Sequence, residues 1–262
     1  MDDDELARLG HLNLLEFLRE SARWTRHGVI HEENGLLCVA GERDFPVLVN
    51  GAARTDDNAD ATATVKAAAE FFGAMGRGFT VFARDTGADD DLRAAAESAG
   101  LSELFASPEM ICRRRLDDRQ LPAGADVRRV TDVNGVADLA EVNAQAYTVY
   151  GMPADVLRDG FSRPEAALAP HINAFVAYVE DEPVSAAMTC VSHGIAGVYW
   201  VGTVEAARGK GLGEACTRAA TNAGFDLGGR VQSLQASPMG EPIYLRMGYE
   251  TVYRYHHYVK GS

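Results

Sequence analysis

The sequence predicts a mixed α/β protein, in which helices cover a sheet of parallel and antiparallel strands. Three observations lead to this fold class. Apolar extended segments alternate with capped, alanine-rich helical segments along most of the 262 residues. A glycine-rich turn near residue 210 joins an apolar extended run to a helical segment. Finally, the order strand, helix, strand, helix, strand occurs once in each half of the chain.

The first half is expected to begin with a helix that runs to Trp24 and is capped by Asp3 or Asp4. Short extended pieces are then expected over 28–33, 36–41 and 45–52. The order continues with a capped helix over 55–76, a strand over 79–84, a helix over 88–101 and a strand over 108–116. Glycine, proline and acidic residues mark residues 117–126 as a linker.

The second half is expected to begin with a strand over 126–130 and helices over 131–147 and 153–161. A hairpin of two strands, 173–181 and 182–192, precedes a central strand over 196–204. After the glycine-rich turn come a helix over 215–228, a strand over 231–237, a short helix over 238–248 and a closing strand over 249–259.

Length and charge limit the class of protein. The chain is long enough for one large domain or two of ordinary size, and 47% apolar and 24% charged residues are typical of a globular protein. A net charge of −13 disfavours nucleic acid and anionic membranes as partners, because their phosphates would be repelled. No apolar run reaches the roughly 18 residues of a membrane-spanning helix. An acidic surface can attract a cationic amine, although general solubility is the favoured explanation of the charge.

The four cysteines are scattered and form no Cys-x-x-Cys pair. This pattern is typical neither of a zinc site nor of a disulfide framework, so we expect no metal and a reducing, cytoplasmic location. The acidic start MDDDELARL lacks the basic residues of a secretory signal, and no export is expected.

The turn Arg208-Gly209-Lys210-Gly211-Leu212-Gly213 carries the main functional signal. Backbone N–H groups at a helix N-terminus can bind a phosphate, and glycines let the anion approach closely. Two basic side chains in the turn add charge of the right sign. We therefore interpret the turn as the pyrophosphate site of a CoA-type cofactor. A nucleotide P-loop is excluded because Gly211 occupies the position where Ser or Thr binds Mg²⁺.

A second marker, LQASPMGEPIYLRMGYE, lies about 30 residues further on, and together the two resemble the GCN5-related N-acetyltransferase (GNAT) family. The family's turn is Arg/Gln-x-x-Gly-x-Gly/Ala, and its later marker is a strand, a loop and a tyrosine-bearing helix followed by Gly-Phe/Tyr. The matching positions are Arg208, Gly211 and Gly213 in the first marker, and Tyr244, Gly248 and Tyr249 in the second. The resemblance covers about residues 126–260 and implies a GNAT, acyl-CoA N-acyltransferase-like fold. Glu205 departs from the proline of many relatives.

The resemblance implies that acetyl-CoA is the co-substrate. Backbone amides of the turn would hold its pyrophosphate, and the central strand, splayed from its neighbour, would bond its pantetheine arm. Ser237 stands where an asparagine often contacts the cofactor. The implied cofactor-binding residues are Val201, Gly202, Thr203, Arg208, Gly209, Lys210, Gly211, Leu212, Gly213, Glu214 and Ser237.

Tyr244 matches the general acid of the family, which protonates the departing CoA sulfur; the alternative is a ring that packs under the last strand. The acceptor pocket is expected near Tyr147, Tyr150 and Tyr199. Because residues alternate along a strand, Tyr199 and Trp200 are not expected to face the same side. No general base is assigned: Glu141 and His193 are candidates, but a surface role is favoured for both, and deprotonation of the amine through water is expected.

The implied function is an N-acetyltransferase that passes the acetyl group to a primary amine by direct attack. The acceptor is a small molecule or a peptide, and the chain is a monomer or a homodimer. The alternative is a catalytically silent acyl-CoA-binding sensor or scaffold. The repeated element order indicates two tandem GNAT copies, a catalytic one at 126–262 and a degenerate one at 1–118. The first copy has aspartates (ARTDDNADAT, 53–62) where a phosphate site needs glycines.

Overall fold

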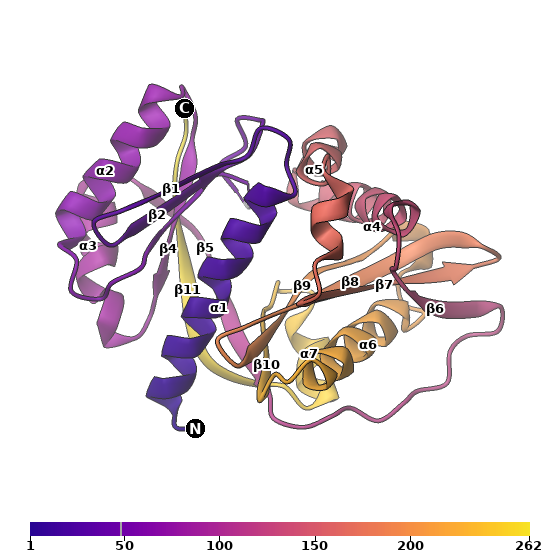
Figure 1. Ribbon diagram of the computed structural model, residues 1–262. Coiled ribbons are helices and arrows are strands. Elements are labelled where there is room, and N and C mark those ends of the chain that lie inside the picture. The colour runs from indigo at the N-terminus through magenta and orange to yellow at the C-terminus, as the bar shows by residue number, and fades with distance from the viewer. Residues whose placement is uncertain (48) are drawn as a thin grey trace.

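The computed structural model describes residues 1–47 and 49–262. In chain order the helices are α1 (Asp3–Arg23), α2 (Ala61–Ala74), α3 (Asp90–Ser98), α4 (Val133–Ala146), α5 (Ala154–Gly160), α6 (Leu212–Asp226) and α7 (Glu241–Met247). The strands are β1 (Val29–Glu33), β2 (Leu36–Ala40), β3 (Gly51–Arg54), β4 (Phe79–Arg84), β5 (Ser102–Cys112), β6 (Ala125–Arg129), β7 (Ile172–Val179), β8 (Glu182–Ser192), β9 (Ile195–Thr203), β10 (Val231–Gln235) and β11 (Glu250–Lys260). The predicted mixed α/β class is confirmed (Figure 1).

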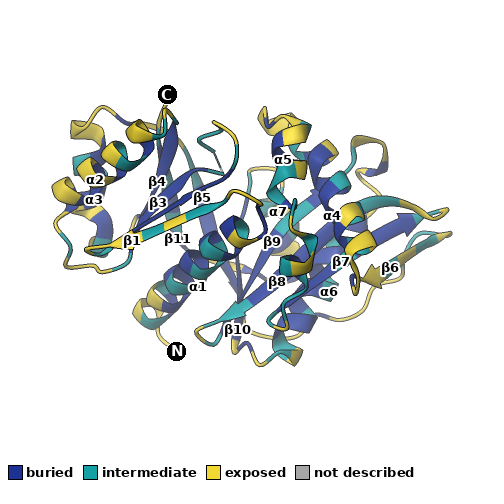
Figure 2. Cartoon of the chain, turned by 45° about the horizontal axis from the view of Figure 1, so that its top comes forward, coloured by how far each residue is buried: buried dark blue, intermediate teal, exposed yellow. Residues whose placement is uncertain are grey.

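The described strands form one mixed sheet of 11 strands, in the order β1-β2-β3-β4-β11-β5-β10-β9-β8-β7-β6. α1, α4 and α5 share an apolar core with one face of the sheet. α2 and α3 pack on the other face in the first half, and α6 and α7 do so in the second half. Figure 2 shows the central strands buried between these layers, whereas the outer sides of α2 and α3 are exposed.

The two longest-range pairings lie in the middle of the sheet. β11, the last strand, is antiparallel to both β4 and β5. β5, the last strand of the first half, is antiparallel to β10 as well as to β11. Each half therefore completes its part of the sheet with a strand from the other half. The sheet is continuous across the predicted boundary between 1–118 and 126–262, and the division into two copies stays a prediction.

The two halves also share a pattern of strand directions. Antiparallel strands lead inward from each outer edge to one parallel pair, β3 with β4 in the first half and β9 with β10 in the second. Both parallel ladders contain three residue pairs. Beyond the last pair the strands are no longer bonded to each other, so each half contains a splayed pair of strands.

Two local expectations in the first half are wrong. The cap of α1 is Asp2, whose carboxylate accepts from the Glu5 N–H at 2.8 Å, because the helix begins one residue earlier than expected. The extended piece expected over 45–52 is a strand only from Gly51; Leu48 lies outside the described residues. Pro46 lacks an N–H for a strand ladder, and the Asn50 side chain bonds the Gly41 N–H, which fixes a loop.

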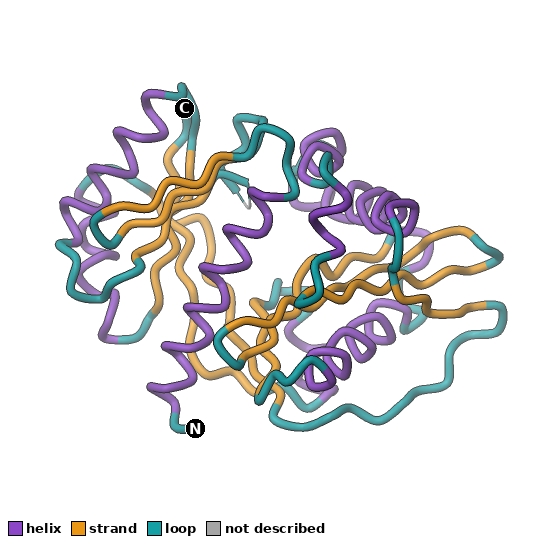
Figure 3. Tube along the Cα trace, in the orientation of Figure 1, coloured by secondary structure: helices purple, strands orange, loops and turns teal. Residues whose placement is uncertain are grey.

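The connection between the halves also differs from the expected bounds. β5 begins at Ser102 and ends at Cys112, so the three arginines that follow it lie outside the strand. Residues 113–124 form no regular element, and Figure 3 shows them as a long loop that leads to β6.

A buried carboxyl group lies where the halves join. Glu109 on β5 is 1% exposed and lies between Gln235 of β10 and Tyr253 of β11. Gln235 donates to its Oε2, whereas Oε1 has no partner among the described residues. Burial raises the pKa of Glu109 to about 8. The neutral acid is therefore the form that suits this site at pH 7.

We predict that Glu109→Gln flattens the pH dependence of stability. The folded-state pKa lies above the unfolded value, so the stabilisation from the proton is complete below about pH 4.5 and is lost as the pH rises towards about 8. Between these limits the free energy of unfolding should fall by roughly 2–4 kcal/mol more in the wild type than in the variant. Urea denaturation at several pH values measures the free energy of unfolding, and a variant at an exposed position, Glu182→Gln, is the control. Parallel pH curves for wild type and variant would contradict the prediction.

Candidate functional site

The site is built around a strand edge that has no strand partner. β9 pairs with β8 along most of its length. On its other side it pairs with β10 only at Ile195, Ala196 and Gly197. Beyond Gly197 the backbone groups on this edge face no strand among the described residues. A free edge can bond an extended ligand in the way that it would bond another strand.

A bulge interrupts β9 at the start of this edge. Trp200 has a φ of 49°, and the register against β8 shifts between Ala186 and Met188. The bulge brings Tyr199 and Trp200 to the same face, where both rings contact Phe17 of α1. The expectation that these two residues face opposite sides is therefore wrong, because the strand is not regular here.

The glycine-rich turn lies at the end of this edge. Gly209 and Gly211 have φ values of 75° and 79°, a conformation that glycine adopts without strain. The N–H groups of residues 209–211 donate to no described protein atom, and those of 212–214 form the first turn of α6. At Gly213 a Cβ would lie 2.8 Å from the Thr203 hydroxyl, so the absence of a side chain lets the helix start against β9.

Strand edge and turn open into one cavity of about 490 Å³, a volume within the usual range for small-molecule sites. Thirteen of the predicted residues line it: Tyr147, Tyr150, Val201, Gly202, Thr203, Arg208, Gly209, Gly211, Leu212, Gly213, Glu214, Ser237 and Tyr244. Two predicted residues do not line it. The Lys210 ammonium donates to the Ala206 carbonyl at 3.0 Å, and Tyr199 lies beneath α1.

The cavity is also lined by two arginines that the sequence analysis did not single out, Arg119 and Arg246. Arg119 lies in the connection between the halves and donates to both oxygens of Glu214 at 2.9 Å. Glu214 also pairs with Arg218 at 2.8 Å. The one carboxylate at the start of α6 is thus neutralised by two guanidinium groups, which keeps the turn favourable for an anion.

Solved structures with the same arrangement cover most of the chain. A GCN5-related N-acetyltransferase from Kribbella flavida superposes with a TM-score of 0.69 at 18% identity, over 96% of this chain and 95% of that one. One from Sphaerobacter thermophilus gives 0.58 at 15% identity, over 87% and 81%. A tandem GNAT protein from the clavulanic acid biosynthesis pathway gives 0.57 at 14% identity, over 86% and 78%. The chain has the GNAT fold. No protein-family model matches it, and no curated protein sequence does.

The GNAT fold with its mixed sheet is therefore confirmed as predicted, and it extends over both halves of the chain. In the described part of the chain no helix has both the length and the apolar composition needed to cross a membrane.

Tyr244 of α7 lies at the wall of the cavity with 8% of its surface exposed. Gly240 permits this position, since a Cβ there would lie 2.7 Å from the tyrosine ring. Burial raises the pKa of the Tyr244 phenol above its ordinary value. The hydroxyl therefore stays protonated at neutral pH and is able to donate a proton or a hydrogen bond.

The three tyrosines expected near the acceptor have different positions. The Tyr147 hydroxyl donates to the Val201 carbonyl at 3.4 Å, and Tyr150 lies at the cavity rim with 46% exposure. Tyr199 is buried: its ring stacks on Phe17 at 3.6 Å and its hydroxyl donates to Asn13 Oδ1 at 2.7 Å. The geometry places Tyr147 and Tyr150 at the cavity and gives Tyr199 a packing role.

Neither candidate base lines the cavity. Glu141 on α4 forms an exposed ion pair with Arg158 at 2.7 Å, and this hydrogen bond lowers the pKa of Glu141. His193 lies in the turn between β8 and β9 with a φ of 53°.

The splayed pair in the first half is filled by protein side chains. Arg54 follows the last paired residue of β3 and Arg84 ends β4, and both guanidinium groups donate to the buried Asp89. Asp57, from the aspartate-rich loop, accepts from Arg84 at 2.6 Å. Burial alone would raise the pKa of Asp89, but the hydrogen bonds and charge of Arg84 hold it below its ordinary value. Ion pairs among Arg54, Arg84, Asp57 and Asp89 therefore lie where the β3–β4 ladder ends.

We predict that Tyr199→Phe destabilises the fold by about 1–3 kcal/mol, because it leaves buried Asn13 Oδ1 without its donor. Tyr150→Phe, at the exposed rim, is the matched control and should change stability by less than about 0.5 kcal/mol. The midpoint of urea unfolding measures both. Equal stabilities of the two variants would show that the Asn13 contact contributes nothing.

Proposed function

We propose that this protein is an N-acetyltransferase that binds acetyl-CoA in the 490 Å³ cavity and transfers the acetyl group to a primary amine. The observation that carries this proposal is that the free edge of β9, the unpaired amides of the turn and the Tyr244 phenol all face one cavity. Each of these features suits a different part of the donor. The GNAT fold of the chain agrees with this assignment.

The cavity fits the donor along its length. Amides of residues 209–214 are free to hold the pyrophosphate at the positive end of α6. The pantetheine arm runs along the cavity wall formed by Val201, Gly202 and Thr203, with Ser237 also lining the cavity, and it competes with the Tyr147 hydroxyl for the Val201 carbonyl. Arg119, Arg208 and Arg246 supply positive charge for the phosphates. The Lys210 side chain is turned away, so this residue takes part through its amide.

In the proposed reaction the neutral amine attacks the thioester carbonyl. The carbon–sulfur bond breaks, and the sulfur takes up the proton of the Tyr244 hydroxyl. Burial keeps the Tyr244 phenol protonated at neutral pH, and the proton that the attacking nitrogen loses on forming the amide returns to the tyrosinate through water. The ammonium form of the acceptor loses its proton to water, and no side chain is assigned as base.

We also propose that the chain contains two GNAT copies, of which only 126–262 is catalytic. The matching strand directions and the two three-pair parallel ladders support this division. Residues 1–118 bind no donor, because Arg54, Arg84 and Asp89 fill the corresponding splay. The acceptor is a small-molecule or peptide amine. A cytoplasmic location and a monomeric or homodimeric state remain predictions.

Release of CoA from acetyl-CoA, measured with a panel of primary amines, tests the proposal. Tyr244→Phe should lower kcat by about 10²-fold or more, while the dissociation constant of acetyl-CoA changes by less than about threefold. The control is Tyr258→Phe, whose hydroxyl contacts Glu97 far from the cavity. Tight acetyl-CoA binding without amine-dependent release, unchanged in Tyr244→Phe, would instead establish the silent sensor or scaffold.

A second prediction concerns the connection between the halves. Arg119→Ala removes a positive charge and leaves Glu214 less neutralised beside the phosphate site, so acetyl-CoA should bind about 5- to 10-fold more weakly. Adding Glu214→Gln should restore most of the loss, and higher salt should reduce the effect. Arg115→Ala, in the same connection but paired with Asp226, is the control. Titration calorimetry measures all four proteins; an unrescued double variant would contradict the prediction.

A further inference from the structure

A series of aromatic rings leads from the core to the mouth of the proposed donor cavity. It begins at Phe161, continues through Trp200 and Tyr147, and ends at Tyr150. Successive rings stand edge to face, with centroids 6.0, 5.3 and 5.7 Å apart and interplanar angles of 63°, 61° and 63°. The charge distribution of aromatic rings favours this arrangement. The series therefore gives its last ring, Tyr150, a defined place at the rim of the cavity.

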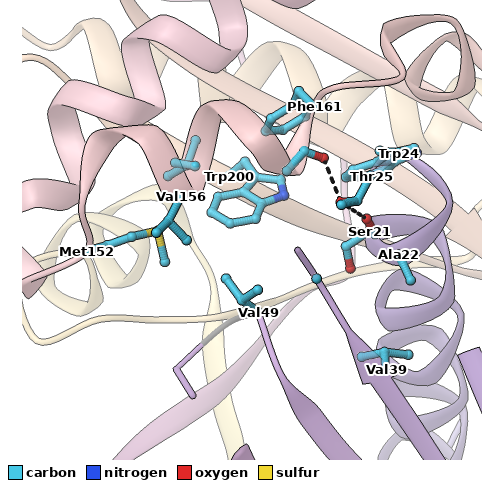
Figure 4. Close-up of a pocket in the computed structure, with 13 residues that line it drawn as sticks. Ser21, Ala22, Trp24, Thr25, Val39, Val49, Met152, Val156, Phe161 and Trp200 are labelled. Atoms are coloured by element: carbon cyan, nitrogen blue, oxygen red, sulfur yellow. Dashed lines mark hydrogen bonds between the residues drawn. The ribbon is translucent and has the colours of Figure 1, made fainter. Parts of the chain in front are cut away.

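Only the outer end of this series is open to a ligand. Phe161 and Trp200, at the inner end, line a hollow together with Met152 and Val156 (Figure 4). Its volume of about 40 Å³ holds about three water-sized groups, so no ligand of substrate size fits there. Tyr150, in contrast, is 46% exposed, and its ring packs on no described ring other than that of Tyr147. A further ring can extend the series only at Tyr150.

This end of the series lies beside the proposed reaction centre. Tyr147, Tyr150 and Tyr244 all line the donor cavity. The Tyr147 hydroxyl donates to the carbonyl of Val201, on the free edge of β9, at 3.4 Å. Burial, and then the nearby phenol of Tyr150, raise the pKa of Tyr244, which agrees with the two rings being neighbours. A molecule that packs on Tyr150 is therefore next to the hydroxyl proposed to protonate the sulfur.

Other apolar side chains are exposed at the same rim. Met239 lines the cavity and is 51% exposed, and Val149, next to Tyr150 in the chain, is also 51% exposed. Met239 precedes Gly240, where a Cβ would lie 2.7 Å from the ring of Tyr244. It therefore borders the reaction centre from the segment that leads to α7. Exposed apolar groups that gather at the mouth of a cavity mark a binding surface for an apolar ligand.

The charges of the cavity limit what else such a ligand carries. Of the four charged residues among its described lining, three are arginines, and the fourth, Glu214, already pairs with two guanidinium groups. One of the three, Arg208, donates to the carbonyl of Ala146, one residue before Tyr147, at 3.4 Å. An amine with several ammonium groups would meet like charge here and find no unpaired carboxylate among these residues.

From this geometry we infer that the acceptor is a primary monoamine with an aromatic ring, which packs on Tyr150 at the rim while its amine enters the cavity beside Tyr244. The inference rests on the proposed function and gives it a substrate class, for example 2-phenylethylamine. The ligand ring continues the edge-to-face series, and Met239 is a further apolar contact. Because the ring lies at the open mouth, it needs none of the volume that the donor occupies. Polyamines and aminoglycosides are disfavoured, since their additional charges find no partner.

Saturation-transfer NMR tests the ring site without turnover. With CoA bound, irradiation of protein signals should saturate the ring protons of 2-phenylethylamine. Tyr150→Ala should remove most of this signal, because it removes the ring on which the ligand packs. Leu104→Ala, at a 57% exposed apolar position in the first half, is the control and should leave the signal unchanged. A ring signal that is absent from the wild type, or equally strong in Tyr150→Ala, would overturn the inference.

Kinetics give an independent readout. 2-Phenylethylamine should exceed ethylamine in kcat/KM by about 10-fold or more, because burial of an apolar group gives about 10- to 200-fold discrimination. Tyr150→Ala should reduce this ratio several-fold through KM, and Tyr150→Phe, which keeps the ring, should preserve it. Spermidine should be a poorer acceptor than 2-phenylethylamine.

The same assay separates this inference from the proposed function. Equal use of 2-phenylethylamine and ethylamine, or a preference for spermidine, would overturn the inference alone. No release of CoA with any amine would count against the proposed function.

Discussion

The antiparallel pairing of β5 with β11 is the interaction on which the rest of the molecule depends. It places the last strand of each half next to the strands of the other. Neither half has a complete sheet without this exchange. β10, which lies on one side of the proposed site, is held in the sheet by its pairing with β5 of the first half. α1 of the first half packs over β9 of the second half, where Phe17 contacts Tyr199 and Trp200.

The fold and the proposed donor site were largely predictable because their signals are local. A helix N-terminus after a glycine-rich turn depends on residues within one short segment, and so does the position of Tyr244 relative to Gly248. The backbone conformation of such segments is set by their own residue types: Gly211 has a φ of 79° and Gly248 a φ of 98°, values that glycine adopts readily. The two apolar runs of β7 and β8, which meet at Asp181 and Glu182, likewise predicted a hairpin whose bounds differ little from those observed.

What the sequence could not predict depends on residues far apart. Strict alternation along β9 was the wrong assumption, because the bulge at Trp200 is set by register against β8 and no residue type marks it. Arg119 reaches Glu214, 95 residues away, only after the connection has folded back along α6. The burial of Glu109 was not predictable from its own strand, because it results from the pairing of β5 with β10 and β11. In each case the decisive neighbour is a tertiary one.

The two splayed strand pairs show how one backbone geometry has two outcomes. In both halves a parallel ladder ends after three pairs and leaves polar backbone groups that need partners. In the first half Arg54, Arg84 and Asp89 fill the space, with Asp57 of the following loop as an additional partner. In the second half the following turn is glycine-rich, its amides are free, and a cavity remains. The residues at the strand ends and in the turn that follows therefore decide the outcome: charged side chains that pair with one another fill the space between the strands, whereas a glycine-rich turn with free amides leaves it to a ligand.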